Sequence, residues 1–165
     1  MKISSGSMLL GAILLSNQLL AADVIRHKTP NSDFPIAMAV EIPAGKTQVY
    51  LSGAGPSIAD KSLPPTSPAA YGNTRDQTIS TLEKIKATLQ SIKLEMKDVV
   101  KMQVFLVGDP AMAGKMDFAG FMEGYVKYFG AAAGQPNLPS RSTMQVAGLA
   151  NPGWLVEIEV TAVRK

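Results

Sequence analysis

Residues 74–107 read TRDQTISTLEKIKATLQSIKLEMKDVVKMQVFLV, and their apolar pattern changes from that of a helix to that of a strand. In the first part, apolar residues recur at steps of three and four and so share one helical face: Ile79, Leu82, Ile85, Leu89 and Ile92. Thr74 and Gln77 have the spacing of a capping box, which predicts Thr74 as the N-cap of the helix. In the second part, alternation predicts a half-buried strand with one apolar face: Val100, Met102, Val104 and Leu106.

Alternation also predicts strands before this helix and near the end of the chain. Apolar residues fall on alternate positions at Ile36, Met38, Val40 and Ile42. A turn follows at residues 43–46, and residues 47–52 are the expected return strand of a hairpin. Residues 53–68 are rich in Gly, Pro and Ser, which predicts a long loop that forms a surface excursion or the rim of a site. Two further strands are expected at residues 142–146 and 154–164.

A second helix is predicted to begin near Asp117, its N-cap candidate, and to stop at Gly130. Gly120 and Gly124 lower the helix propensity inside it and indicate close packing against another backbone. The order of elements is therefore strand-strand-helix-strand-helix-strand-strand. This order favours an α+β fold with two helices on one face of a mostly antiparallel sheet. Residues 23–165 are expected to form this one domain.

The first 22 residues have the pattern of an export signal. Lys2 precedes a short apolar run at residues 8–20, and the small residues Ala21 and Ala22 follow it. We therefore expect residues 1–22 to be a signal peptide and the rest to be periplasmic or secreted. An uncleaved N-terminal anchor or an apolar cytosolic terminus is the alternative reading.

Composition excludes several classes of site. The chain has 165 residues, no cysteine and one histidine, which rules out disulfides, thiolate metal sites and thiol nucleophiles. His27 alone cannot form a multi-histidine metal site. The formal charge of +3 is small and scattered, and no basic patch is interleaved with aromatic residues, so no nucleic-acid partner is expected.

The strongest candidate for a binding residue is Arg141, which follows a stiff proline at a loop-to-strand junction. A guanidinium held in this way can bind a carboxylate through two hydrogen bonds. Thr143 lies two positions on and shares its strand face. Glu157 and Glu159 leave the apolar face of the last strand and must meet solvent, an arginine or another subunit. Taken alone, each of these residues could equally be an ordinary surface side chain.

Three segments together resemble the Rid family of reactive-intermediate (imine) deaminases, also called the YjgF family. They are residues 74–107, NLPSRSTMQVAGL at 137–149 and VEIEVTAVRK at 156–165, in that order. The resemblance implies a chorismate-mutase-like fold, a homotrimer with sites between subunits, and no cofactor. It also implies hydrolysis of 2-imino or enamine acids such as 2-iminobutanoate or 2-iminopropanoate to 2-keto acids and ammonia.

The resemblance assigns roles to four residues of this chain. Arg141 would bind the substrate carboxylate, Thr143 and Ser52 would supply hydroxyl contacts, and Glu157 would act on the hydrolytic water. Ser52 and Glu157 are thus the predicted catalytic residues, and Arg141 and Thr143 the predicted substrate-binding residues.

This sequence departs from the family pattern at three residue positions and in a longer loop after Ser52. The family's Gly-Pro-Tyr motif appears as Phe34-Pro35-Ile36, a common asparagine of the second helix is Met122, and an expected glycine after the first helix is Lys93. Two other functions therefore stay open. One is a noncatalytic trimer that binds 2-keto acids or other small carboxylates, and the other is a chaperone-like or ribonuclease-type role.

Overall fold

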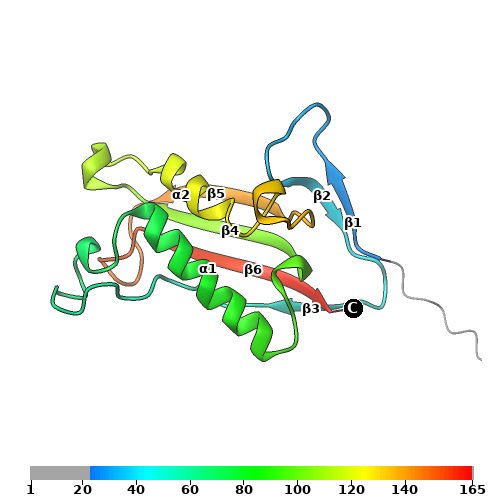
Figure 1. Cartoon of the computed structure of the whole chain (residues 1–165), viewed down its shortest axis with the longest axis horizontal. Helices are drawn as coiled ribbons and strands as arrows, with labels where there is room; N and C mark the ends of the chain where they lie inside the picture. Colours follow the sequence, from blue (N-terminus) through cyan, green and yellow to red (C-terminus); the bar gives the residue numbers. More distant parts are fainter. Residues whose placement is uncertain (1–22, 165) are drawn as a thin grey trace, which may run out of the picture.

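The computed structural model describes residues 23–164, and the predicted signal peptide at residues 1–22 lies outside the described residues. Eight main elements follow one another along the chain (Figure 1): β1 (Ile25–Lys28), β2 (Ala37–Glu41), β3 (Thr47–Tyr50), α1 (Thr74–Ser91), β4 (Val99–Val107), α2 (Phe118–Tyr125), β5 (Ser140–Val146) and β6 (Val156–Arg164). Short 3-10 turns lie between several of them. Within residues 23–164, no helix has the length and apolar character needed to cross a membrane.

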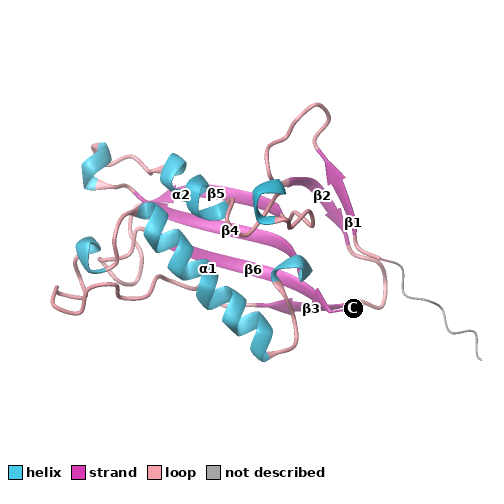
Figure 2. Ribbon diagram, viewed as in Figure 1, coloured by secondary structure: helices cyan, strands magenta, loops and turns pink. Residues whose placement is uncertain are grey.

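The main sheet has the strand order β3-β6-β4-β5. The pairs β3–β6 and β4–β6 are antiparallel, and only β4–β5 is parallel. Both α1 and α2 lie over the same face of this sheet (Figure 2). The predicted α+β arrangement, with two helices on one face of a mostly antiparallel sheet, is therefore confirmed.

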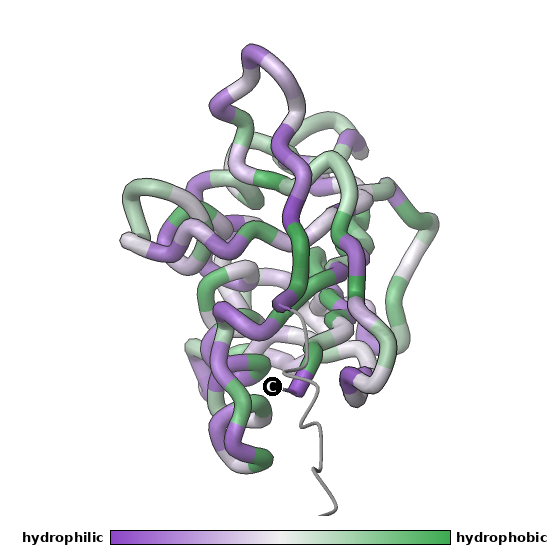
Figure 3. The backbone as a smooth tube through the Cα atoms, turned by 90° about the vertical axis from the view of Figure 1, so that its right-hand side faces the viewer, coloured by the Kyte–Doolittle hydropathy of each residue, from purple (hydrophilic) through white to green (hydrophobic). Residues whose placement is uncertain are grey.

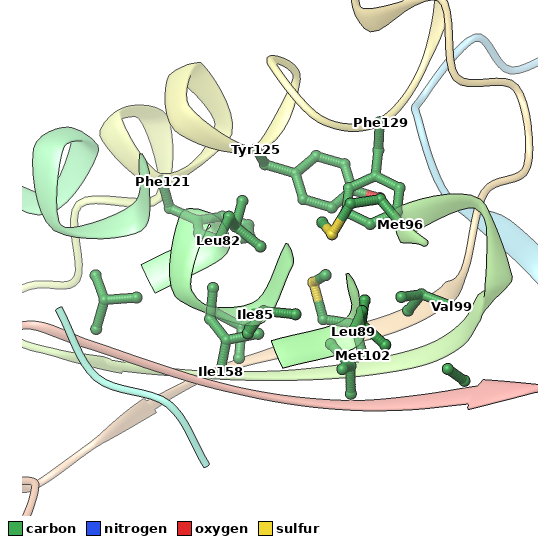
Figure 4. Close-up of a cluster of buried hydrophobic side chains, with 14 of the residues drawn as sticks. Leu82, Ile85, Leu89, Met96, Val99, Met102, Phe121, Tyr125, Phe129 and Ile158 are labelled. Atoms are coloured by element: carbon green, nitrogen blue, oxygen red, sulfur yellow. The ribbon is translucent and has the colours of Figure 1, made fainter. Parts of the chain in front are cut away.

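The core lies between the helices and the sheet, and strand alternation determines which residues enter it. On β4, Met102, Val104 and Leu106 are fully buried, and they pair with the buried Val160, Ile158 and Val156 of β6. Helix α1 contributes Leu82, Ile85 and Leu89, and α2 contributes Phe121 and Tyr125 (Figure 4). Burying a large apolar side chain stabilises the fold by about 1.5–3 kcal/mol, so this layer provides most of the driving force.

The start of α1 differs from the prediction. Asn73 is the N-cap, and its side chain accepts a hydrogen bond from the backbone N–H of Asp76 at 3.0 Å. Gln77 forms no capping box; its fully buried amide donates to the carbonyl of Gly153 and accepts from the N–H of Leu155. These bonds need Gln77 inside the molecule, where it fastens α1 to the turn before β6.

The predicted hairpin is wrong in its pairing, because β2 pairs with β1 and β3 pairs with β6. The short, polar β1 was not predicted as a strand. Arg26 holds β1 in place by donating to the backbone carbonyls of Lys97, Val99 and Leu138. The N–H of Ala37 in turn donates to the carbonyl of Pro139, which fixes β2 beside the beginning of β5. The connection between β1 and β2 forms the hydrophilic tip at the top of Figure 3.

The two glycines of α2 have different causes. A Cβ on Gly124 would lie 2.8 Å from the side chain of Thr78 and 3.0 Å from the carbonyl of Arg75, so α1 and α2 approach closely there, as predicted. A Cβ on Gly120 would instead meet the carboxylate of Asp117, the residue that caps α2. Only Gly124 reports on packing between helices.

The long loop is a surface excursion that covers the turn before β6. The Tyr71 hydroxyl donates to the carbonyl of Pro65, and Asn151 donates to that hydroxyl. A Cβ on Gly153 would lie 3.0 Å from the carbonyls of both Pro65 and Ser67. Loop and turn are therefore in direct backbone contact.

Candidate functional site

Arg141 lies within β5, one residue after the strand begins, and it pairs with Met102 of β4. Met102 is fully buried under the helices, and neighbouring residues of paired strands point to the same side. The guanidinium therefore extends toward α2 on the helix-covered face. Pro139, which precedes the strand, is buried and accepts the hydrogen bond from Ala37. The stiff junction predicted from the sequence is present.

Aromatic rings surround the Arg141 guanidinium. Its Cζ lies 4.3 Å from the ring centroid of Tyr125, 4.9 Å from that of Phe121, 5.4 Å from that of Phe34 and 5.9 Å from that of Phe118. Each such cation–π contact stabilises the charge by about 0.5–1 kcal/mol at exposed sites and by more when desolvated. The rings hold a positive charge, and the Tyr125 hydroxyl is the single oxygen that these four rings bring to it.

The guanidinium is left with an unsatisfied donor. Nη2 donates to the thioether sulfur of Met122 at 3.2 Å, which is a weak acceptor, and Nη1 is buried with no hydrogen-bond partner. The hydroxyl of Thr143, two residues along the same strand face, is also buried without a partner. Such groups are rare in folded proteins because each costs about 1–3 kcal/mol. Two of them on one strand face indicate a place for a ligand.

Ionisation at this site is set chiefly by burial. Burial lowers the pKa of Arg141, and the neighbouring Tyr125 opposes that shift, but a guanidinium stays charged at any pH a protein survives. Burial raises the pKa of Tyr125, with the charge of Arg141 opposing, so the phenol stays neutral. Its hydroxyl donates to the carbonyl of Pro35 at 2.8 Å. The site thus holds a fixed cation and a neutral phenol.

Glu157 and Ser52 form a second group. Glu157 pairs with Phe105 and lies on the sheet face that the helices leave open. A Cβ on Gly53 would lie 2.6 Å from Oε1 of Glu157, so this carboxylate rests on the segment that carries Ser52. An open groove of about 500 Å³ borders Ser52 and is lined also by Lys84 and Trp154. Ser52 borders this groove, whereas Glu157 is not among its lining residues and approaches it only through Gly53.

The structure does not bring all four predicted residues together in one chain. Arg141 and Thr143 share the helix-covered face, whereas Glu157 lies on the opposite face of the same sheet. Strand β5 carries Arg141 and Thr143, and β3 ends just before Ser52. These two strands are the edges of the sheet. A site that used both groups would need a second protomer.

Sequence reasoning missed the rings that surround Arg141. The aromatic residues of α2 recur along one helical face, a pattern typical of core residues, and Phe121 and Tyr125 are indeed fully buried. Phe34 was noted only as part of a changed motif. Met122 could have indicated this neighbourhood. It stands where the family commonly has asparagine, and its sulfur contacts Arg141 directly. Ile36, which replaces the family tyrosine, is half-buried just before β2.

Known proteins resemble this chain over most of its length. A RutC family protein of Pyrococcus horikoshii is 33% identical over 102 residues, which are 62% of this chain and 71% of that protein. A RutC family protein of Pyrococcus abyssi is 28% identical and covers 88% of this chain and 100% of its own.

Solved structures share the fold. The structure of E. coli TdcF with bound serine is 29% identical, covers 79% of this chain and 93% of that chain, and gives a TM-score of 0.53. A Rid-family protein of Yersinia pestis, YyfB, is 22% identical, covers 85% of this chain and 96% of that one, and gives a TM-score of 0.60. The family described as endoribonuclease L-PSP matches residues 30–164. Because this match spans nearly all of the described residues, the chain belongs to that family, which includes the YjgF and Rid proteins.

Proposed function

We propose that this protein hydrolyses 2-imino acids to 2-keto acids and ammonia, with Arg141 binding the substrate carboxylate. The observation that carries the proposal is the buried Nη1 of Arg141, which has no partner and lies on the same strand face as the unpartnered hydroxyl of Thr143. A carboxylate would satisfy both donors. Hydrogen bonds to charged groups contribute about 1.5–3 kcal/mol, which is enough to orient a small substrate.

The reaction needs water and a proton carrier. Water attacks C2 of the imine, the C=N bond becomes a single bond in a carbinolamine, and nitrogen then leaves as ammonia while oxygen stays as the keto group. Glu157 takes the proton from water and returns it to the departing nitrogen. Ser52 supplies a hydroxyl beside this carboxylate. Holding substrate and water in place is the main contribution of the protein.

The proposed site lies between two protomers of a homotrimer. Proteins of this family generally form homotrimers. In this chain, the helices leave the opposite sheet face open, where Tyr50 is 74% exposed and Gln103 and Glu159 are half-buried. Arg141 and Thr143 of one protomer would then face Glu157 and Ser52 of the next.

A relative supports the class of ligand. The structure of E. coli TdcF contains bound serine, an amino acid whose carboxylate and α-nitrogen are placed as in a 2-imino acid. That protein is 29% identical to this chain. From that ligand we transfer to this chain only the chemical class, a carboxylate with a nitrogen on the adjacent carbon. An arginine beside C2 would have to distinguish these two groups.

The test is a hydrolysis assay with matched variants. An amino-acid oxidase generates 2-iminobutanoate, and the appearance of 2-oxobutanoate is followed with and without the protein. We expect acceleration by the wild type, a fall of about 10–100-fold in kcat/KM for Arg141→Ala, and a fall mainly in kcat for Glu157→Gln. Equal rates for wild type and Arg141→Ala would remove Arg141 from the site.

A noncatalytic binding protein is the second candidate, and the contact of Met122 with Arg141 favours it. The thioether places no strong acceptor or donor beside the guanidinium where the family commonly has an amide. Saturable binding of 2-oxobutanoate that depends on Arg141, without faster imine hydrolysis, would select this function.

We also propose that the protein acts in the periplasm or outside the cell, on the pattern of residues 1–22. Fractionation of cells that express the full chain tests this. Recovery only from the cytosol would contradict it.

A further inference from the structure

The rings around Arg141 fall into two classes. Phe121 and Tyr125 are fully buried and belong to the core, whereas Phe34 is 45% exposed and Phe118 is 36% exposed. The exposed rings come from distant parts of the chain, the connection between β1 and β2 and the first residue of α2. Core packing does not account for their exposure, because a core aromatic is buried.

The exposed rings are placed to meet whatever extends from the guanidinium. Their centroids lie 5.4 Å and 5.9 Å from the Cζ of Arg141. A ligand carboxylate on Nη1 brings the remaining ligand atoms within a few ångströms of the same point, since a small 2-imino acid has only one carbon between carboxylate and side chain. Phe34 and Phe118 are the partly exposed rings at that point.

Polar groups near the guanidinium are few or already occupied. The Tyr125 hydroxyl donates to Pro35, and the Met122 sulfur accepts from Nη2. Thr143 remains, and its hydroxyl lies on β5 beside the proposed position of the carboxylate. Within one chain, a hydroxyl or amide on the ligand side chain would therefore find only the Thr143 hydroxyl and the acceptor side of the Tyr125 hydroxyl.

From these contacts we propose that the preferred substrates are 2-imino acids with a large apolar side chain, foremost those with an aromatic ring. The inference rests on the proposed function and adds its substrate class. Phe34 and Phe118 act as specificity residues: they remove the substrate side chain from water and offer it tilted ring contacts. The hydrolysis itself is unchanged, with water oxygen becoming the keto oxygen and nitrogen leaving as ammonia.

The experiment compares two imines of different side-chain size. An amino-acid oxidase generates 2-imino-3-phenylpropanoate or 2-iminopropanoate, and kcat/KM is measured for each with the mature protein. We expect the phenyl substrate to be favoured by about tenfold or more, since single methylene groups already give about 10–200-fold in apolar pockets.

Variants distinguish the contribution of the two rings to substrate preference from a general loss of folding or activity. Phe118→Ala and Phe34→Ala are expected to reduce the preference ratio by about fivefold each, mainly through KM for the phenyl substrate. Ile58→Ala removes a comparable exposed apolar side chain, 42% exposed, from the loop between β3 and α1, and is expected to leave the ratio unchanged. Calorimetric binding of 3-phenyl-2-oxopropanoate and 2-oxopropanoate to the same variants gives a second readout that needs no turnover.

Each outcome is decisive. Equal or higher kcat/KM for 2-iminopropanoate would overturn the substrate class and leave the proposed function standing. Hydrolysis of neither imine, together with no binding of either keto acid, would overturn both. A phenyl preference that survives in both ring variants would also overturn the roles of Phe34 and Phe118.

Discussion

Arg26 and Arg141 are both half-buried arginines beside the same end of the sheet, but their N–H groups differ in the acceptors that they find. Arg26 donates to three backbone carbonyls, those of Leu138 at 2.9 Å, Lys97 at 3.0 Å and Val99 at 3.1 Å. Arg141 has one weak sulfur acceptor and an Nη1 with none. Burial lowers the pKa of both, opposed by Asp98 in one case and Tyr125 in the other.

This difference separates a structural arginine from a binding arginine. The acceptors of Arg26 belong to the backbone and are present in every state of the folded protein, so its charge is committed to holding β1. The neighbours of Arg141 are rings that tolerate the cation and leave its donors to another molecule. A buried arginine without protein acceptors lowers stability, so we expect a ligand to supply the acceptors.

The largest predicted effect falls on stability at Arg26. Arg26→Ala leaves three carbonyls without their donors, so the free energy of unfolding is expected to fall by about 3 kcal/mol. Urea denaturation followed by circular dichroism measures it. Arg164→Ala is the matched control, because Arg164 makes one exposed bond to Ile92, and its effect is expected to stay within about 0.5 kcal/mol. A fully stable Arg26→Ala would mean that β1 is held by something else.

The next effect falls on binding at Arg141. Arg141→Met keeps the bulk and removes a desolvated charge, so the free energy of unfolding should change by no more than about 1 kcal/mol. The affinity for 2-oxobutanoate should fall by at least about tenfold, because the carboxylate loses its charged partner. Denaturation and calorimetric titration of the same preparation give both numbers. A large loss of stability with unchanged affinity would reverse the comparison.

A smaller effect is expected in the second group, at Gly53. Gly53→Ala places a methyl carbon 2.6 Å from Oε1 of Glu157, and the flexible carboxylate can move away at little cost in stability. We therefore expect kcat to fall by about 3–10-fold with an unchanged melting temperature. Gly148→Ala is the control, since a Cβ there meets nothing within 4 Å. Unchanged kcat in Gly53→Ala would argue that the position of Glu157 is unimportant.

The smallest effect is expected on stability at Lys93, which stands where the family has a glycine after the first helix. Lys93 follows α1 with φ of 61°, a left-handed conformation in which a side chain is strained. Lys93→Gly should raise the free energy of unfolding by about 0.5–1 kcal/mol without altering activity. Ala87→Gly, inside the same helix, should lower it by about 1 kcal/mol. The same sign for both would refute the conformational explanation.

Much of the fold could be predicted because it depends on local periodicity. Alternation correctly predicted which residues of β4 and β6 are buried under the helices. The apolar stripe of α1 correctly predicted the helix face that packs on the sheet. The partner of β2 could not be predicted, because β1 has almost no apolar pattern and is held by Arg26 through carbonyls 71 to 112 residues away. The cap of α1 shifted from Thr74 to Asn73 because Gln77 is used in the core.

The site was predictable only in part. Counting could place Arg141 and Thr143 on one strand face and Glu157 on the face that the helices leave open, but not Arg141 and Glu157 on opposite faces of the sheet. The ring cluster could not be predicted, because Phe34, Phe118, Phe121 and Tyr125 come from two segments that meet Arg141 only after β2 and α2 have packed against β5. Contacts of that kind follow from tertiary structure and leave no spacing in the sequence.

The most direct measurement is a crystal structure of the assembled protein soaked with 2-oxobutanoate. We predict that a carboxylate oxygen of the ligand lies about 3 Å from Nη1 of Arg141, with Glu157 of a neighbouring protomer near C2 of the ligand. A structure in which Nη1 pairs with a protein carboxylate, and the keto acid binds elsewhere or not at all, would contradict the proposed role of Arg141.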